Sequence, residues 1–155
     1  MLSISISETI DLHECKSMSL DIASSNVNRN ITLAGTSVAI FTFLLFFLYP
    51  RSGEINSILF QFTLAIIVSV IFSLVISALY YYGTTLTLTL RPEQTTTIFG
   101  KAEAFWLVGY SLLLLEPSLI LFTVNLIAVG LYGLVLWFSY LYLTWLQYKK
   151  QTRRK

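Results

Sequence analysis

Charged residues are scarce in this chain of 155 amino acids, since Asp, Glu, Lys and Arg together make up only 12% of it. Soluble domains carry about 25% charged residues. The chain has a single cysteine, Cys15, which excludes an intramolecular disulfide, and a single histidine, His13. Hydrophobic residues make up 55% of the sequence, well above the usual share. This composition argues against a soluble globular domain and favours a membrane protein.

The groups that most enzymes use are also missing. The triplet His13-Glu14-Cys15 cannot turn all its side chains toward one metal ion on a helix, and no second cluster completes a site. No serine, cysteine or lysine stands with a base in a recognisable arrangement, and no glycine-rich phosphate loop is present. We therefore expect no enzyme activity, no metal and no other cofactor. A nucleic-acid partner is not expected either, because the one basic run is short.

The hydrophobic residues gather in blocks long enough to cross a bilayer. Residues 31–49 carry no charge, and 19 residues at about 1.5 Å each match a hydrocarbon core of roughly 30 Å. The stretch "PRSGE" then ends this block. A second block covers about residues 55–82 and ends in three tyrosines, which favour the boundary between lipid and water.

The connection at residues 84–101 has no clear helical pattern. Residues 84–90 alternate as in a strand, but an unpaired strand cannot satisfy its backbone inside lipid. We interpret this segment as an extended connection at the interface, with a break at Arg91-Pro92. A helical extension of the second span is the alternative.

The last block, residues 104–148, would be about 67 Å long as one helix, which is enough for two crossings. The chain could turn at Glu116-Pro117 or near Asn125–Gly130. The second division makes both legs about 20 residues long and fits a bilayer better. The sequence thus predicts an all-α integral membrane four-helix bundle with short loops and spans at about residues 31–49, 55–82, 103–125 and 128–148.

Two short segments flank these spans. Residues 1–30 form an N-terminal cytoplasmic segment that lacks the features of a secretory signal and could contain a short amphipathic helix with an acidic face. Residues 149–155 form a basic tail that can rest on anionic headgroups. Its cations are Lys149, Lys150, Arg153, Arg154 and Lys155.

A seven-residue spacing places small and polar residues on one face of the third span. Its members are Ala102, Gly109, Glu116 and Thr123. Seven residues are close to two helical turns, so these residues lie along one line, and small residues let membrane helices approach closely. This seam also favours the turn near residue 125.

Glu116 is then an ionisable group inside the bundle, which is a functional-site hypothesis by default. The predicted spans contain no Lys, Arg or His. The carboxyl group must therefore be neutral, bond to hydroxyls, meet Arg51 from the outer loop, or hold a cation. Pro117 cannot donate to the Leu113 carbonyl, so a kink is expected beside it. The plainer alternatives are a neutral acid that joins two helices, or an interfacial glutamate that caps one.

The second span carries small or polar residues at every fourth position, and they form one ridge along the helix. This helix-packing ridge comprises Gln61, Ala65, Ser69, Ser73 and Ser77. Such a ridge suits close contact with another helix in lipid. It would also suit the wall of a narrow polar path.

The basic residues are distributed very unevenly between the two sides of the predicted bundle. With four spans, nine fall on the side of the termini: Lys16, Arg29, Arg91, Lys101, Lys149, Lys150, Arg153, Arg154 and Lys155. Only Arg51 falls on the other side. The positive-inside rule therefore predicts a multi-pass protein of the cell membrane with both termini in the cytoplasm.

Two functions from different classes fit these patterns. The first is a non-catalytic accessory or structural subunit that packs against other membrane proteins or copies of itself within the lipid bilayer. The second is an oligomeric channel or carrier, with Glu116 and the ridge residues Gln61, Ser69, Ser73 and Ser77 lining an ion or proton path. If Glu116 and the ridge share one cavity, transport is favoured.

Overall fold

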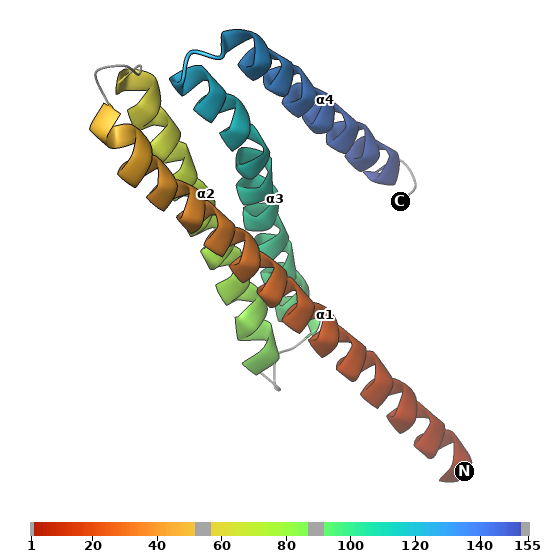
Figure 1. The fold of residues 1–155 in the computed structure, drawn as a ribbon. Helices are drawn as coiled ribbons and strands as arrows, with labels where there is room; N and C mark the ends of the chain where they lie inside the picture. Colours follow the sequence, from red (N-terminus) through yellow and green to blue (C-terminus); the bar gives the residue numbers. More distant parts are fainter. Residues whose placement is uncertain (1, 52–56, 87–91, 153–155) are drawn as a thin grey trace.

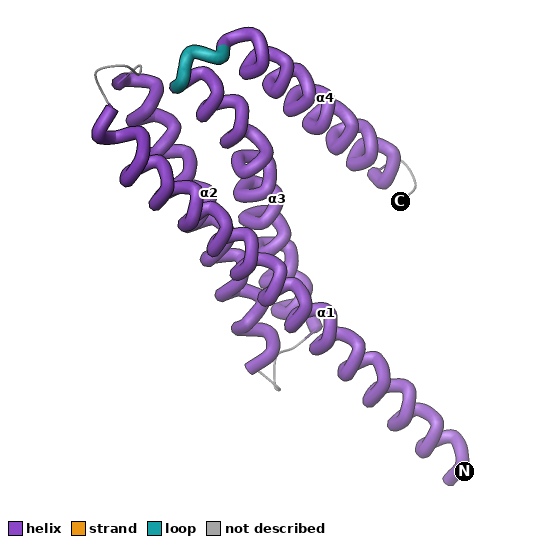
Figure 2. Tube along the Cα trace, viewed as in Figure 1, coloured by secondary structure: helices purple, strands orange, loops and turns teal. Residues whose placement is uncertain are grey.

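The computed structural model describes residues 2–51, 57–86 and 92–152, and these residues are almost entirely helical. In chain order the helices are α1 (Leu2–Phe43), α2 (Ser57–Leu86), α3 (Pro92–Thr123) and α4 (Ile127–Thr152). Figure 2 shows the same arrangement, with no strand in the described ranges. The all-α prediction is confirmed for this part of the chain.

Each of the four helices is long and apolar enough to cross a membrane. The candidate spans are Asp21–Leu48, Ile58–Thr85, Gln94–Thr123 and Ile127–Gln147. They overlap the four blocks that the sequence predicted.

The helix α1 changes its geometry before it ends. After Phe43 it widens into a π-helical turn, Leu44–Leu48, and then tightens into a 3-10 turn, Tyr49–Arg51. Pro50 explains why the regular helix stops here, because it has no N–H to donate to an earlier carbonyl. At its other end α1 reaches Leu2, so the short helix expected within residues 1–30 is part of one continuous helix.

The connection between α2 and α3 is shorter than the sequence suggested. Residues 84–86 belong to α2, so their interpretation as an extended segment is wrong and the alternative helical extension is correct there. The hydroxyls of Thr84 and Thr85 donate to the carbonyls of Tyr81 and Tyr82 at 2.6 and 2.7 Å, which helical geometry allows. The helix α3 starts at Pro92, a residue suited to the first helical turn, so the interpretation of residues 92–101 as an extended connection is also wrong. Residues 87–91 lie outside the described part.

The turn between α3 and α4 lies around Asn125, as in the second of the two divisions that the sequence allowed. Asn125 has a φ of 60°, the left-handed conformation that asparagine tolerates better than most residues. The Leu126 N–H donates to the Leu121 carbonyl at 2.9 Å and so closes the end of α3. Glu116 and Pro117 consequently lie inside α3.

Three helices form the core of the molecule, and the fourth lies beside it. The helix α2 packs against both α1 and α3, whereas α4 packs mainly against α3 (Figure 1). One apolar cluster contains Ala34, Val70 and Leu74, and a second contains Leu44, Phe60 and Ile67. Only 6% of the most apolar part of α4 is buried, so the four-helix arrangement is open on that side.

Candidate functional site

Glu116 lies in the interior between the helices, with 1% of its surface exposed. The Ser37 hydroxyl of α1 donates to its Oε1 atom at 3.3 Å. Its other oxygen, Oε2, is buried and accepts no hydrogen bond from the residues that the structure describes. The carboxyl group therefore joins α1 to α3 through one oxygen and keeps a second oxygen available.

The seven-residue seam that contains Glu116 is buried along its whole length. Ala102, Gly109, Glu116 and Thr123 are all buried, which confirms that the seam packs inside the molecule. A Cβ atom at Gly109 would lie only 3.0 Å from the Cγ atom of Leu74 on α2. The absence of a side chain at Gly109 therefore sets the close approach of α2 and α3.

A second polar contact links all three core helices. The Asn30 side-chain amide of α1 donates to the Ser77 hydroxyl of α2 at 2.9 Å. That hydroxyl in turn donates to the Ala102 carbonyl of α3 at 2.7 Å. Asn30 is fully buried, and its Oδ1 atom has no partner within the described ranges.

A third polar contact lies near the other end of α3. The hydroxyls of Thr63 and Thr123 are 3.2 Å apart, and either can donate to the other. Each hydroxyl can also donate to a carbonyl of its own helix, Leu59 or Leu119, at 2.8 and 2.9 Å. One threonine hydroxyl can thus donate to the carbonyl of its own helix, while the other threonine hydroxyl donates to it across the interface.

These three contacts hold the core helices together at successive levels. Lipid offers no hydrogen bonds, so polar side chains within a span are best satisfied by one another. Each interhelical hydrogen bond contributes on average about 0.6 kcal/mol, up to about 1.7 kcal/mol. Together they also fix the rotation of each helix about its axis, because a rotated helix would leave its polar group in an apolar setting.

The helix-packing ridge of α2 does not follow a single interface. Ser77 is buried, Ser73 is partly buried beside the Gly109 position, and Gln61, Ala65 and Ser69 are exposed. A row at every fourth residue turns by about 40° at each step, or about 160° from the first member to the last. The structure therefore does not bring Gln61 or Ser69 to Glu116.

The remaining predicted site residues lie apart from this interior. Pro117 is exposed on α3, and Arg51 ends the 3-10 turn, although its side chain lies outside the described residues. In the basic tail, Lys149 and Lys150 are exposed at the end of α4, and the Lys149 Nζ atom lies 5.0 Å from the centre of the Trp145 ring. Arg153, Arg154 and Lys155 fall outside the described ranges.

Sequence reasoning missed the partners of the seam, although a signal for them exists. In α1 and the π-helical turn that continues it, Ala23, Asn30, Ser37 and Leu44 recur every seven residues, and all are buried. In α2 the buried residues other than Ala78 fall into two such series: Phe60, Ile67, Leu74 and Tyr81, and Thr63, Val70 and Ser77. The seven-residue spacing that identified the seam on α3 therefore marks the inner face of all three helices, as in a left-handed coiled coil.

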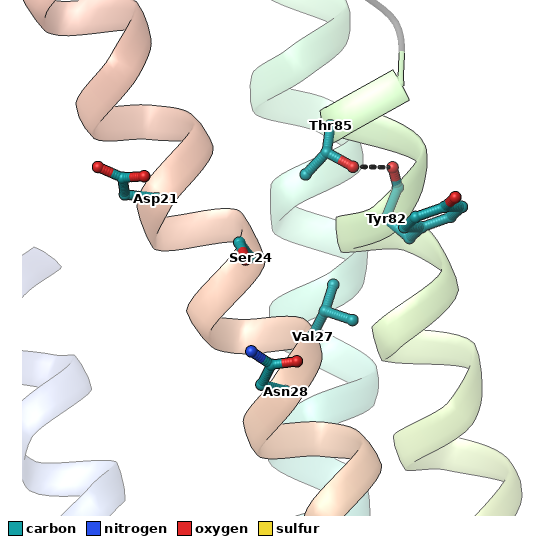
Figure 3. Close-up of a pocket in the computed structure, with 6 residues that line it drawn as sticks. All are labelled: Asp21, Ser24, Val27, Asn28, Tyr82 and Thr85. Atoms are coloured by element: carbon teal, nitrogen blue, oxygen red, sulfur yellow. Dashed lines mark hydrogen bonds between the residues drawn. The ribbon is translucent and has the colours of Figure 1, made fainter.

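Two cavities lie near the end of the core where the α1 span begins. The first, about 420 Å³, is lined by Asp21, Ser24, Val27 and Asn28 of α1 and by Tyr82 and Thr85 of α2 (Figure 3). The second, about 290 Å³, is lined by Asn26, Arg29, Tyr81, Glu103, Trp106 and Leu107. Neither cavity includes Glu116 in its lining.

Comparisons with known proteins do not assign this chain to a family. No family model matches the chain, and the searches of curated proteins and of solved structures also gave no match.

Proposed function

We propose that this chain is a non-catalytic, multi-pass protein of the cell membrane that acts as an accessory or structural subunit. The four long apolar helices support a membrane location. The excess of basic residues beside the two termini supports a cytoplasmic position for both ends. Its partners are other membrane proteins, or further copies of the chain, within the bilayer.

The contrast between the core and the outer surface carries this proposal. The polar groups of the core bond to one another across helices, whereas the ridge residues Gln61, Ala65 and Ser69 face outward. A small and polar helix face gains little from lipid tails but allows a neighbouring helix to approach closely. The exposed half of the ridge is therefore the surface on which we expect a partner helix to pack.

A double substitution on the ridge tests the proposal. The tagged protein is purified in mild detergent, both as wild type and with Ala65→Leu and Ser69→Leu. These residues are exposed, so the variant should keep the thermal stability of the isolated chain while losing its associated chains. Val68→Leu is the matched control, because Val68 is exposed on the same helix but off the ridge.

The composition of the purified material decides the outcome. A complex that the double variant loses and the Val68→Leu control retains supports a subunit that packs through the ridge. If the wild type purifies as a single chain, or if both variants keep the same partners, the ridge is not an assembly surface and the proposal fails.

An ion or proton path through an oligomer is the second candidate function, and one observation favours it. The buried Oε2 atom of Glu116 has no partner in the described part of the chain, so it could exchange a proton or meet a cation. The outward position of Gln61 and Ser69 favours the function of an accessory or structural subunit instead.

Flux through liposomes that contain the purified protein tests this second function. If Glu116 carries a proton or ion, Glu116→Gln should fold normally and abolish the flux. Equal flux in the wild type, the variant and empty liposomes would rule this function out.

A further inference from the structure

The smaller cavity lies where three helices enter their apolar stretches. Arg29 stands just before the apolar residues 31–49, and Glu103 stands just before the apolar block of α3. Tyr81 and Trp106 also line the cavity, and both residue types favour the membrane–water interface. With the spans expected from the sequence, at about residues 31–49, 55–82 and 103–125, this cavity would lie at the depth of lipid headgroups. Its volume of about 290 Å³ is far more than a single water molecule needs.

The cavity combines a cation and an anion that do not neutralise each other. The guanidinium of Arg29 lies 4.3 Å from the centre of the Trp106 ring, and this contact holds it at the wall. Glu103 lines the same cavity, and within the described residues neither charge forms an ion pair. Tyr81 of α2 lines the same cavity as these two charges. The site thus offers two opposite charges to one ligand.

We propose that this cavity binds the headgroup of phosphatidylethanolamine, a zwitterionic phospholipid. The Arg29 guanidinium binds the phosphate, with the Asn26 amide as a further donor at the rim. The Glu103 carboxylate accepts hydrogen bonds from the primary ammonium. The acyl chains extend beside Leu107, along the exposed apolar surface of α3.

The same geometry disfavours the other common headgroups. The trimethylammonium of phosphatidylcholine has no N–H to donate to Glu103, and Arg29 already occupies one face of the Trp106 ring. Phosphatidylglycerol has no cation for Glu103 and would leave that carboxylate beside a phosphate. The acid in the cavity therefore selects for a primary amine.

Lipid titration of the detergent-purified full chain, followed by native mass spectrometry, tests the proposal. The three lipids carry the same acyl chains. Because hydrogen bonds to charged groups are among the stronger ones, phosphatidylethanolamine should bind about tenfold more tightly than phosphatidylcholine or phosphatidylglycerol. Glu103→Gln should remove this preference. Arg29→Gln should weaken the binding of phosphatidylethanolamine and of phosphatidylcholine to a similar extent.

Two variants serve as controls. Lys101→Gln removes an exposed cation that does not line this cavity, and Asp21→Asn removes an acid that lines only the larger one. Both should keep the phosphatidylethanolamine preference. Equal affinity of the wild type for all three lipids would overturn the proposal without any variant. Tightest binding of phosphatidylglycerol, or a preference that survives Glu103→Gln, would also overturn it.

Discussion

At the scale of single residues, the buried carboxyl group of Glu116 is the most demanding feature of the molecule. The Ser37 hydroxyl bonds to one of its oxygens, and no described cation lies against it within the spans. An isolated charge at this depth would be costly, so a neutral acid that joins α1 to α3 is the arrangement that the burial favours.

Substitutions of Glu116 test this description. Glu116→Gln should leave folding almost unchanged, because an amide keeps the shape and the acceptor for Ser37 without a charge. Glu116→Lys should be severe, since a lysine at the centre of a span costs about 2.5–3.5 kcal/mol on insertion scales. Thermal unfolding in detergent and the inserted fraction in membranes measure both effects. If the Glu116→Gln variant is as unstable as the Glu116→Lys variant, the description of Glu116 as a neutral acid is wrong.

At the scale of the helices, the core depends on residues spaced seven apart on α1, α2 and α3. The spacing keeps each inner face in register with its neighbours over the whole span. At Gly109, a Cβ atom added to the glycine would meet the Leu74 side chain at 3.0 Å, which is the distance of a tight contact. Packing at this point should therefore be sensitive to volume.

Two glycines on α3 provide a matched comparison. Gly109→Leu should destabilise the protein by about 1–3 kcal/mol, because added bulk forces α2 and α3 apart. Gly100→Leu should be neutral or slightly stabilising, since a Cβ atom at Gly100 meets nothing within 4 Å and leucine favours a helix. Thermal unfolding in detergent gives both values. Equal effects at the two positions would show that Gly109 does not set the helix spacing.

Much of the fold could be predicted from the sequence, but the partners of each helix face could not. Block lengths located four apolar helices, and the spacing of Gly109, Glu116 and Thr123 marked the buried face of α3. The contact of Glu116 with Ser37 depends on how α1 is rotated and shifted against α3. The sequence does not reveal this arrangement, because residues that face lipid and residues that face another helix are equally hydrophobic. The open position of α4 was missed for the same reason.

At the scale of the whole molecule, the charge distribution and the open side of the bundle complement each other. The basic residues collect beside the two termini, and the apolar surface of α4 stays largely uncovered. In the function proposed above, the first feature would orient the protein in a bilayer, and the second would leave room for a neighbour.

The orientation leads to a direct prediction. A reporter enzyme that is active only outside the cytoplasm should be inactive when fused after Lys155, because the predicted topology puts nine basic residues on the side of the termini and one on the other. The same reporter placed between α1 and α2 should be active. Activity at the C-terminal fusion would show that the termini face outward.

The polar groups of the core join the helices in an interior that is closed to water. Labelling of Glu116→Cys in a Cys15→Ser background, with a membrane-impermeant thiol reagent added from each side, tests it most directly. Lys150→Cys and Leu126→Cys, both at exposed positions, report access at the two ends of α4. We predict rapid labelling of each control from its own side and protection of position 116 from both. Rapid labelling of position 116 from either side would show that water reaches Glu116 and that the interior is not closed.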